Sequence, residues 1–136
     1  MTQLEALQAA LAGEHAAVYG VGVAGGKLSG ARFRAATDAY DQHRRNRDRL
    51  SALVVAAGQT PAAAEPAYDL PQAVTNAATA AALILLIERR VAAVYGDLVE
   101  AAEQAPVRAL AIESLLEAAT AQLAWGGAPA AFPGDA

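Results

Sequence analysis

Four charged or titratable side chains lie on helix faces that the spacing of apolar residues predicts to point into the core. They are Glu14, His43, Arg47 and Glu88. Three of them lie near the middle of three predicted helices, and Glu113 and Glu117 lie on either side of the middle of a fourth. If the helices pack side by side, these residues meet at one level. Because an unpaired buried carboxylate is costly, it must find a cationic partner or stay protonated.

Two kinds of chemistry would satisfy such carboxylates. In di-iron carboxylate bundles, two helices each supply a Glu and two others each supply a Glu-x-x-His motif, and together these bind the metal. The other solution is pairing within the protein, in which Arg47 and a protonated His43 balance Glu14 and Glu88.

The residue types favour internal pairing. A Glu-x-x-His motif ending at His43 would need Glu at position 40, where the chain has Tyr40. The motifs starting at Glu113 and Glu117 would need His at positions 116 and 120, where the chain has Leu and Thr. No Glu-x-x-His motif is therefore complete. Arg47, one turn from His43, would also repel a metal ion. We therefore expect a buried polar cluster, a degenerate metal site, no cofactor and no catalytic residue. The alternative is an iron or manganese site using Glu14, His43, Glu88, Glu113 and Glu117.

Four segments with apolar residues at helical spacing would position these side chains, at about 2–24, 29–57, 76–103 and 106–124. Thr2 with Glu5 has the form of a capping box, and Ser29 is a candidate N-cap. Gly58 suits the position after a helix end, and Pro106 suits the first turn of a helix. The chain is thus predicted to be all-α.

The lengths of the connections predict the topology. The first and second helices, and the third and fourth, are joined by a few residues each, so each pair must be antiparallel. The connection at about 58–75 contains three prolines and could extend over roughly 59 Å, whereas the second helix is only about 43 Å long. This crossover can therefore make the second and third helices parallel. We expect a ferritin-like four-helix bundle of two antiparallel hairpins.

Several stretches of the sequence are distinctive when taken together. They are LQAALAGEHAAVY at 7–19, HRRNRDRL at 43–50, LPQAVT at 70–75, ERRVAAVY at 88–95, and WG with AFPG in the tail at about 125–136. Together they resemble an uncharacterised ferritin-like domain family common in actinobacteria. The resemblance covers nearly the whole chain, which we interpret as one domain, 1–136. It implies a ferritin-like bundle that self-associates, and it implies no known activity or catalytic residue.

Composition and charge disfavour several classes of function. Hydrophobic residues make up 55% of the 136 residues, Cys is absent, and the formal net charge is −4, which disfavours nucleic-acid binding. The longest apolar run, 77–87, is shorter than the roughly 20 residues of a membrane span, and the N-terminus lacks the basic region of a signal peptide. We therefore expect a cytoplasmic protein with no membrane or nucleic-acid partner.

The remaining features have structural interpretations. The basic run 43–49 is expected to be a solvated helix face, and the apolar stretch 83–87 to be covered by the crossover or by a second subunit. Tyr19, Tyr40 and Tyr95 are expected to be core tyrosines, and Trp125 and Phe132 to anchor the tail. The overall prediction is a non-enzymatic structural or interaction protein that forms a homodimer, with no identifiable protein partner. The alternative is a metal-binding protein or oxidoreductase.

Overall fold

The computed structural model describes residues 1–135, which form four α-helices and no strand. The helices are α1 (Gln3–Gly25), α2 (Gly30–Ala56), α3 (Ala77–Ala101) and α4 (Ala105–Ala124). The prediction of an all-α chain with four helices is therefore confirmed, and every helix end lies close to its expected position. None of the helices in the described part of the chain is long and apolar enough to cross a membrane.

Local hydrogen bonds explain where the helices begin and end. At the start of α1, the Glu5 amide donates to Thr2 Oγ1 (3.1 Å) and the Thr2 amide donates to Glu5 Oε2 (2.8 Å), which is the predicted capping box. Ser29 occupies the N-cap of α2 but makes no side-chain capping bond. After α2, Gly58 adopts a φ of +79°, a backbone conformation that glycine reaches without strain.

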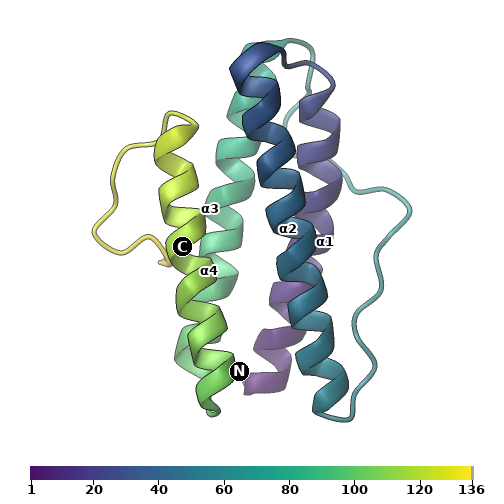
Figure 1. Ribbon diagram of the computed structural model, residues 1–136, viewed down its shortest axis with the longest axis vertical. Helices are drawn as coiled ribbons and strands as arrows, with labels where there is room; N and C mark the ends of the chain where they lie inside the picture. Colours follow the sequence, from purple (N-terminus) through teal and green to yellow (C-terminus); the bar gives the residue numbers. More distant parts are fainter. Residues whose placement is uncertain (136) are drawn as a thin grey trace.

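The helices form two antiparallel hairpins joined by a long crossover (Figure 1). Helix α1 runs from the bottom of the view to the top and α2 returns. The crossover then climbs the full height of the molecule, so that α3 runs parallel to α2 and α4 antiparallel to α3. Helix α1 packs against both α2 and α3, and α3 also packs against α4. Helices α2 and α4, which form the remaining edge of the bundle, pack less closely than any of these three pairs.

The crossover is attached to the bundle through α1. The Gln8 side chain donates to the Thr60 carbonyl and accepts from the Ala62 amide, both at 2.8 Å. Farther along, Leu70 and Val74 pack against the core. These contacts hold a proline-containing segment, which has no helix of its own, along the outside of the hairpins.

The apolar stretch of α3 is buried within the chain. Leu83, Ile84 and Ile87 are buried, and Leu85 and Leu86 are half-buried. Leu70 of the crossover lies against the same side of the bundle as Ile87, because both come near the position that a Cβ at Gly20 would occupy. The crossover therefore covers the part of this stretch near Ile87, and covering by a second subunit stays a prediction.

The C-terminal tail is attached by Trp125 and by a close backbone contact. Trp125 is buried, and the Arg32 guanidinium lies 5.5 Å from its ring centroid. Phe132 is 74% exposed, so the prediction that it anchors the tail is wrong. The tail instead approaches α3 where two glycines meet, since a Cβ on Gly96 would lie 2.6 Å from the Gly134 carbonyl oxygen. Residue 136, the end of the predicted tail, lies outside the described residues.

This contact predicts opposite effects for two Gly-to-Ala substitutions within helices. Gly96→Ala should lower the melting temperature and shift the Gly134 NMR signals towards random-coil values. The added methyl group would occupy the position of the tail backbone and so displace the tail from α3. In Gly22→Ala the new Cβ would lie 3.5 Å from Tyr40 Cε2, an ordinary contact. The higher helix propensity of Ala should then stabilise that variant by up to about 1 kcal/mol. Unchanged Gly134 signals in Gly96→Ala would contradict the tail contact.

Candidate functional site

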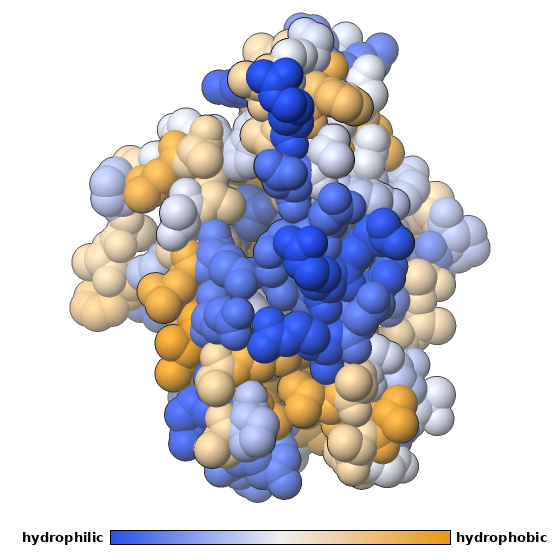
Figure 2. Space-filling view, viewed as in Figure 1, coloured by the Kyte–Doolittle hydropathy of each residue, from blue (hydrophilic) through white to orange (hydrophobic). Residues whose placement is uncertain are grey.

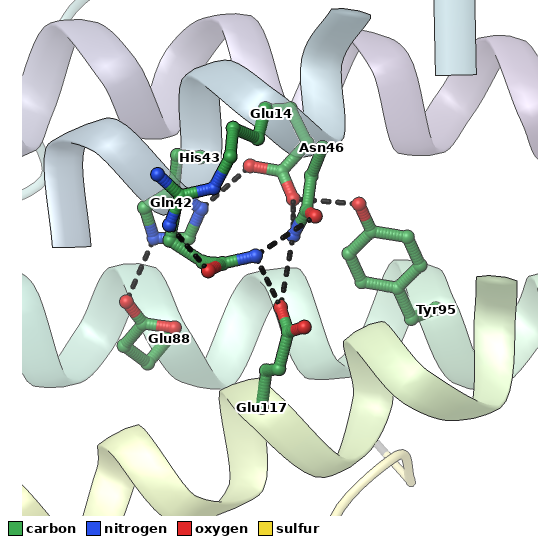
Figure 3. A network of polar contacts seen from close by, with 8 residues as sticks. Glu14, Gln42, His43, Asn46, Glu88, Tyr95 and Glu117 are labelled. Carbon is green, nitrogen blue, oxygen red and sulfur yellow. Dashed lines mark hydrogen bonds and ion pairs between the residues drawn. The ribbon is translucent and has the colours of Figure 1, made fainter. Parts of the chain in front are cut away.

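A buried histidine joins carboxylates from two other helices at the centre of the molecule (Figure 3). His43 of α2 bonds through Nδ1 to Glu14 Oε2 of α1 at 2.6 Å, and through Nε2 to Glu88 Oε1 of α3 at 2.7 Å. All three residues are buried, with exposed fractions of 0% for Glu14, 4% for His43 and 2% for Glu88. We call these residues, with the side chains bonded to Glu14, the central cluster.

The geometry favours the doubly protonated imidazolium form of His43. An ionised carboxylate can only accept hydrogen bonds, so two such partners require an N–H on both ring nitrogens. Burial alone lowers the pKa of His43, but the hydrogen bonds and negative charges of Glu14 and Glu88 outweigh this and raise it from 6.5 to about 10. His43 is therefore a cation at neutral pH.

Two further donors complete the environment of Glu14. Its other oxygen, Oε1, accepts from the Tyr95 hydroxyl at 2.6 Å and from Asn46 Nδ2 at 3.4 Å. Burial and the adjacent Glu14 charge raise the pKa of Tyr95 above its usual value, so the phenol keeps its proton. Side chains of His43, Tyr95 and Asn46 thus surround the Glu14 carboxyl group, so this buried polar group has hydrogen-bond partners on both oxygens.

Polar side chains connect the central cluster to the protein surface along the α2–α4 edge. Asn46 also bonds to Glu117 Oε2 (3.3 Å), which accepts from Gln42 as well (2.8 Å). Arg45 NH2 donates to Gln42 Oε1 at 2.8 Å. Figure 2 shows hydrophilic residues gathered in the middle of the face that it presents. Glu117 is therefore an outer member of the network.

Two residues that the sequence placed with the cluster lie elsewhere. Arg47 points away from Glu14 and Glu88, and its guanidinium pairs with Asp48 at 2.9 Å, so its predicted role as the buried counter-charge is wrong. A long arginine side chain can bury its aliphatic part and still bring its charge to water. Glu113 is exposed and pairs with Arg49 at 3.1 Å, which removes it from the candidate metal ligands.

The sequence did not indicate the polar neighbours Asn46 and Gln42. Asn46 lies one turn after His43 and could have been found as an uncharged polar residue within an otherwise charged run. Tyr95 is fully buried and bonded inside the bundle, as a core tyrosine was expected to be, whereas Tyr19 and Tyr40 are only half-buried. His15 lies within α1, outside the central cluster, and bonds to the Ala62 carbonyl at 2.9 Å.

The arrangement places charges of opposite sign against one another inside the protein. Both His43 nitrogens face carboxylates, so neither has a free lone pair to accept a proton or bind a metal. Among the described residues, no three His, Asp or Glu side chains are grouped so that they could hold a metal ion. A small cavity of about 60 Å³ does lie beside the cluster, lined by Glu88, Ser114 and Glu117 among others. It has room for ordered water.

The fold and the central cluster define a class: an all-α protein of two helical hairpins around a buried carboxylate–imidazolium network. The chain belongs to the family described as a domain of unknown function (DUF4439), which matches residues 6–136. It is also similar to a solved structure, a conserved hypothetical protein, rv2844, from Mycobacterium tuberculosis. That similarity has 36% sequence identity and a TM-score of 0.88, and covers 90% of this chain and 93% of the other. A search of curated proteins found no match.

The raised pKa of His43 predicts how stability depends on pH. The folded state binds the His43 proton more tightly than the unfolded state, so the stabilisation is fully present below pH 6.5 and is lost as pH rises to about 10. Each pKa unit corresponds to about 1.4 kcal/mol, which limits this contribution to about 5 kcal/mol. Urea denaturation should show the free energy of unfolding falling across this range.

His43→Gln is the matched control for this pH dependence, because Gln can still donate to a carboxylate but cannot titrate. Its stability should be lower than that of the wild type at pH 6.5 and nearly constant up to pH 10. Parallel profiles for the two proteins would show that another group is responsible. The titratable groups facing His43 are Glu14 and Glu88, and Tyr95 contacts the former.

Proposed function

We propose that this protein is a non-enzymatic, ferritin-like helical protein with a structural or interaction role, in which an imidazolium occupies the place of a metal ion. The observation that supports this most directly is the bridge from Glu14 through His43 to Glu88. A metal ion at this level would need the carboxylates and a free imidazole nitrogen. In this chain the same atoms bond to one another.

The charge balance supports the proposal. Two buried carboxylates are met by one imidazolium, and the remaining negative charge is stabilised by donation from Tyr95 and Asn46 to Glu14. Both nitrogens of His43 and both oxygens of Glu14 thus have partners within the protein, which is why we assign no cofactor. The ferritin-like assignment is supported by the two antiparallel hairpins joined by a long crossover (Figure 1). It is also supported by the meeting of Glu14, His43 and Glu88 at one level of the bundle. We also propose that the protein is cytoplasmic.

Metal content and the response to Glu88→Ala test this proposal together. Protein purified from cells grown with added iron and manganese should contain far less than one metal ion per chain, and EDTA should leave its melting temperature unchanged. Glu88→Ala should cost about 3–5 kcal/mol of stability, because it leaves the His43 charge with one fewer partner in the interior. Stoichiometric metal that is lost in Glu88→Ala would instead support the alternative, a metal-binding protein or oxidoreductase using Glu88 and Glu117.

Glu113→Ala is the control for Glu88→Ala. Glu113 is exposed, and its partner Arg49 is exposed too, so removing this pair should change stability by about 1 kcal/mol or less. A loss as large as that of Glu88→Ala would show that burial of the central cluster is not the reason for the effect.

We also propose that the protein is a homodimer joined through the outer face of α4. Ile112, Leu116 and Leu123 on this helix are 45%, 62% and 50% exposed. Together with Ala119 they follow a 4-3-4 spacing, which is that of a helix–helix seam. Hydrophobic atoms also gather along the α4 side of the molecule in Figure 2. A second copy of α4 related by two-fold symmetry would present the same seam.

Leu116→Glu should convert the dimer to a 13.8 kDa monomer in sedimentation experiments, because it places two like charges in the centre of the symmetric contact. Val55→Glu is the control, since Val55 is 59% exposed but belongs to α2. It should leave the dimer intact. A wild-type protein that sediments as a monomer at high concentration would refute this interface.

A further inference from the structure

A groove between α1, α2 and the crossover contains three of the four tyrosines in the chain. It has a volume of about 450 Å³ and is lined by Tyr19 from α1, Tyr40 from α2 and Tyr68 from the crossover, with His15 and Arg47 beside them. This volume lies within the range of about 300–1,000 Å³ typical of small-molecule sites. None of these five residues belongs to the central cluster.

The tyrosines provide aromatic surface and free polar groups. The Tyr19 and Tyr68 rings contact each other, with centroids 5.6 Å apart and planes inclined by 53°. The Tyr68 hydroxyl accepts a bond from the Glu65 amide at 2.9 Å. Within residues 1–135, the hydroxyls of Tyr19 and Tyr40 have no hydrogen-bond partner in the protein, so both remain available.

A positive charge lies at the α2 side of the groove. Arg47 is paired only with Asp48, whose side chain is 69% exposed, and such a surface pair contributes little. A second guanidinium, that of Arg44, lies outside the lining, 5.6 Å from the centroid of the Tyr40 ring and 3.8 Å from the Asp41 carboxylate. The one acidic residue in the lining, Glu65, belongs to the crossover and is exposed. The α2 wall is thus suited to an anion.

We infer that this groove binds a planar aromatic compound that carries an anionic group. The aromatic part would stack on the tyrosines, as bases stack on aromatic side chains in other proteins. The anion would pair with Arg47, whose planar guanidinium matches phosphate and carboxylate oxygens. This also gives a role to the arginine that the sequence placed in the core and the structure places here.

The crossover should respond to such a ligand, because it forms one wall of the groove. It is fixed at Ala62 by His15 and Gln8, whereas residues 63–67 are exposed. A ligand seated against Tyr68 would therefore slow hydrogen exchange in residues 63–68. The central cluster should show no such change, which separates groove binding from a general stabilisation.

Isothermal titration calorimetry with four probes tests the inference. AMP carries both an aromatic base and a phosphate, adenosine lacks the phosphate, ribose 5-phosphate lacks the base, and indole-3-carboxylate carries a carboxylate on a different aromatic ring. AMP or indole-3-carboxylate should bind at least about tenfold more tightly than adenosine and ribose 5-phosphate, because only they use both walls. The stronger of the two shows which combination of ring and anion the groove prefers. Absence of saturable binding by both at millimolar concentration would refute the inference.

Variants then locate the site, with thermal melting used to verify that each one is folded. Arg47→Gln should weaken binding of the better anionic probe by about tenfold, while Arg34→Gln, an exposed position of α2 outside the groove, should not. Tyr68→Ala should weaken it by about tenfold through lost stacking, while Tyr68→Phe should retain it. Equal effects of Arg47→Gln and Arg34→Gln, or no effect of Tyr68→Ala, would overturn the assignment to this groove.

Discussion

Burial of Glu14 and Glu88 is the constraint on which the rest of the bundle depends. Two carboxylates removed from water need cationic and hydrogen-bonding partners, and His43 supplies both nitrogens to them at 2.6 and 2.7 Å. These bonds connect α1, α2 and α3 at one level, so they fix the rotation of each helix about its axis as well as neutralising charge. Apolar packing alone would tolerate many such rotations, and a polar network with short bonds tolerates few.

The topology explains how one histidine can reach both carboxylates. Helix α1 packs against α2 and α3, which places its carboxylate between two neighbours. Helices α2 and α3 are linked by the crossover and run parallel (Figure 1), and the His43 ring extends across the interior to the Glu88 side chain. At the loosely packed α2–α4 edge, Asn46, Gln42 and Glu117 continue the network outwards. Polar groups thus line this edge of the bundle, beside the small cavity.

The crossover does more than connect the hairpins. It covers part of the apolar stretch of α3, and it contributes Tyr68 to the groove that also holds Arg47. The central cluster and the groove lie in different environments. In the interior an imidazolium is fully paired, whereas in the groove a guanidinium has only a weak surface partner and faces aromatic rings. The first arrangement suits stability, and the second suits recognition.

The sequence by itself determined the four helices, their approximate ends and the antiparallel hairpins, because capping residues, helix-breaking glycines and prolines, and connection lengths act locally along the chain. It also placed Glu14, His43 and Glu88 on inward faces at one level. Only the tertiary structure decided which cation meets those carboxylates. Positions 43 and 47 lie on the same side of α2, and helical spacing cannot distinguish a short imidazole that stays inside from a long guanidinium that reaches water. In the same way, the pairing of Asn46 with Glu14 and the assembly of three tyrosines into one groove depend on residues far apart in sequence.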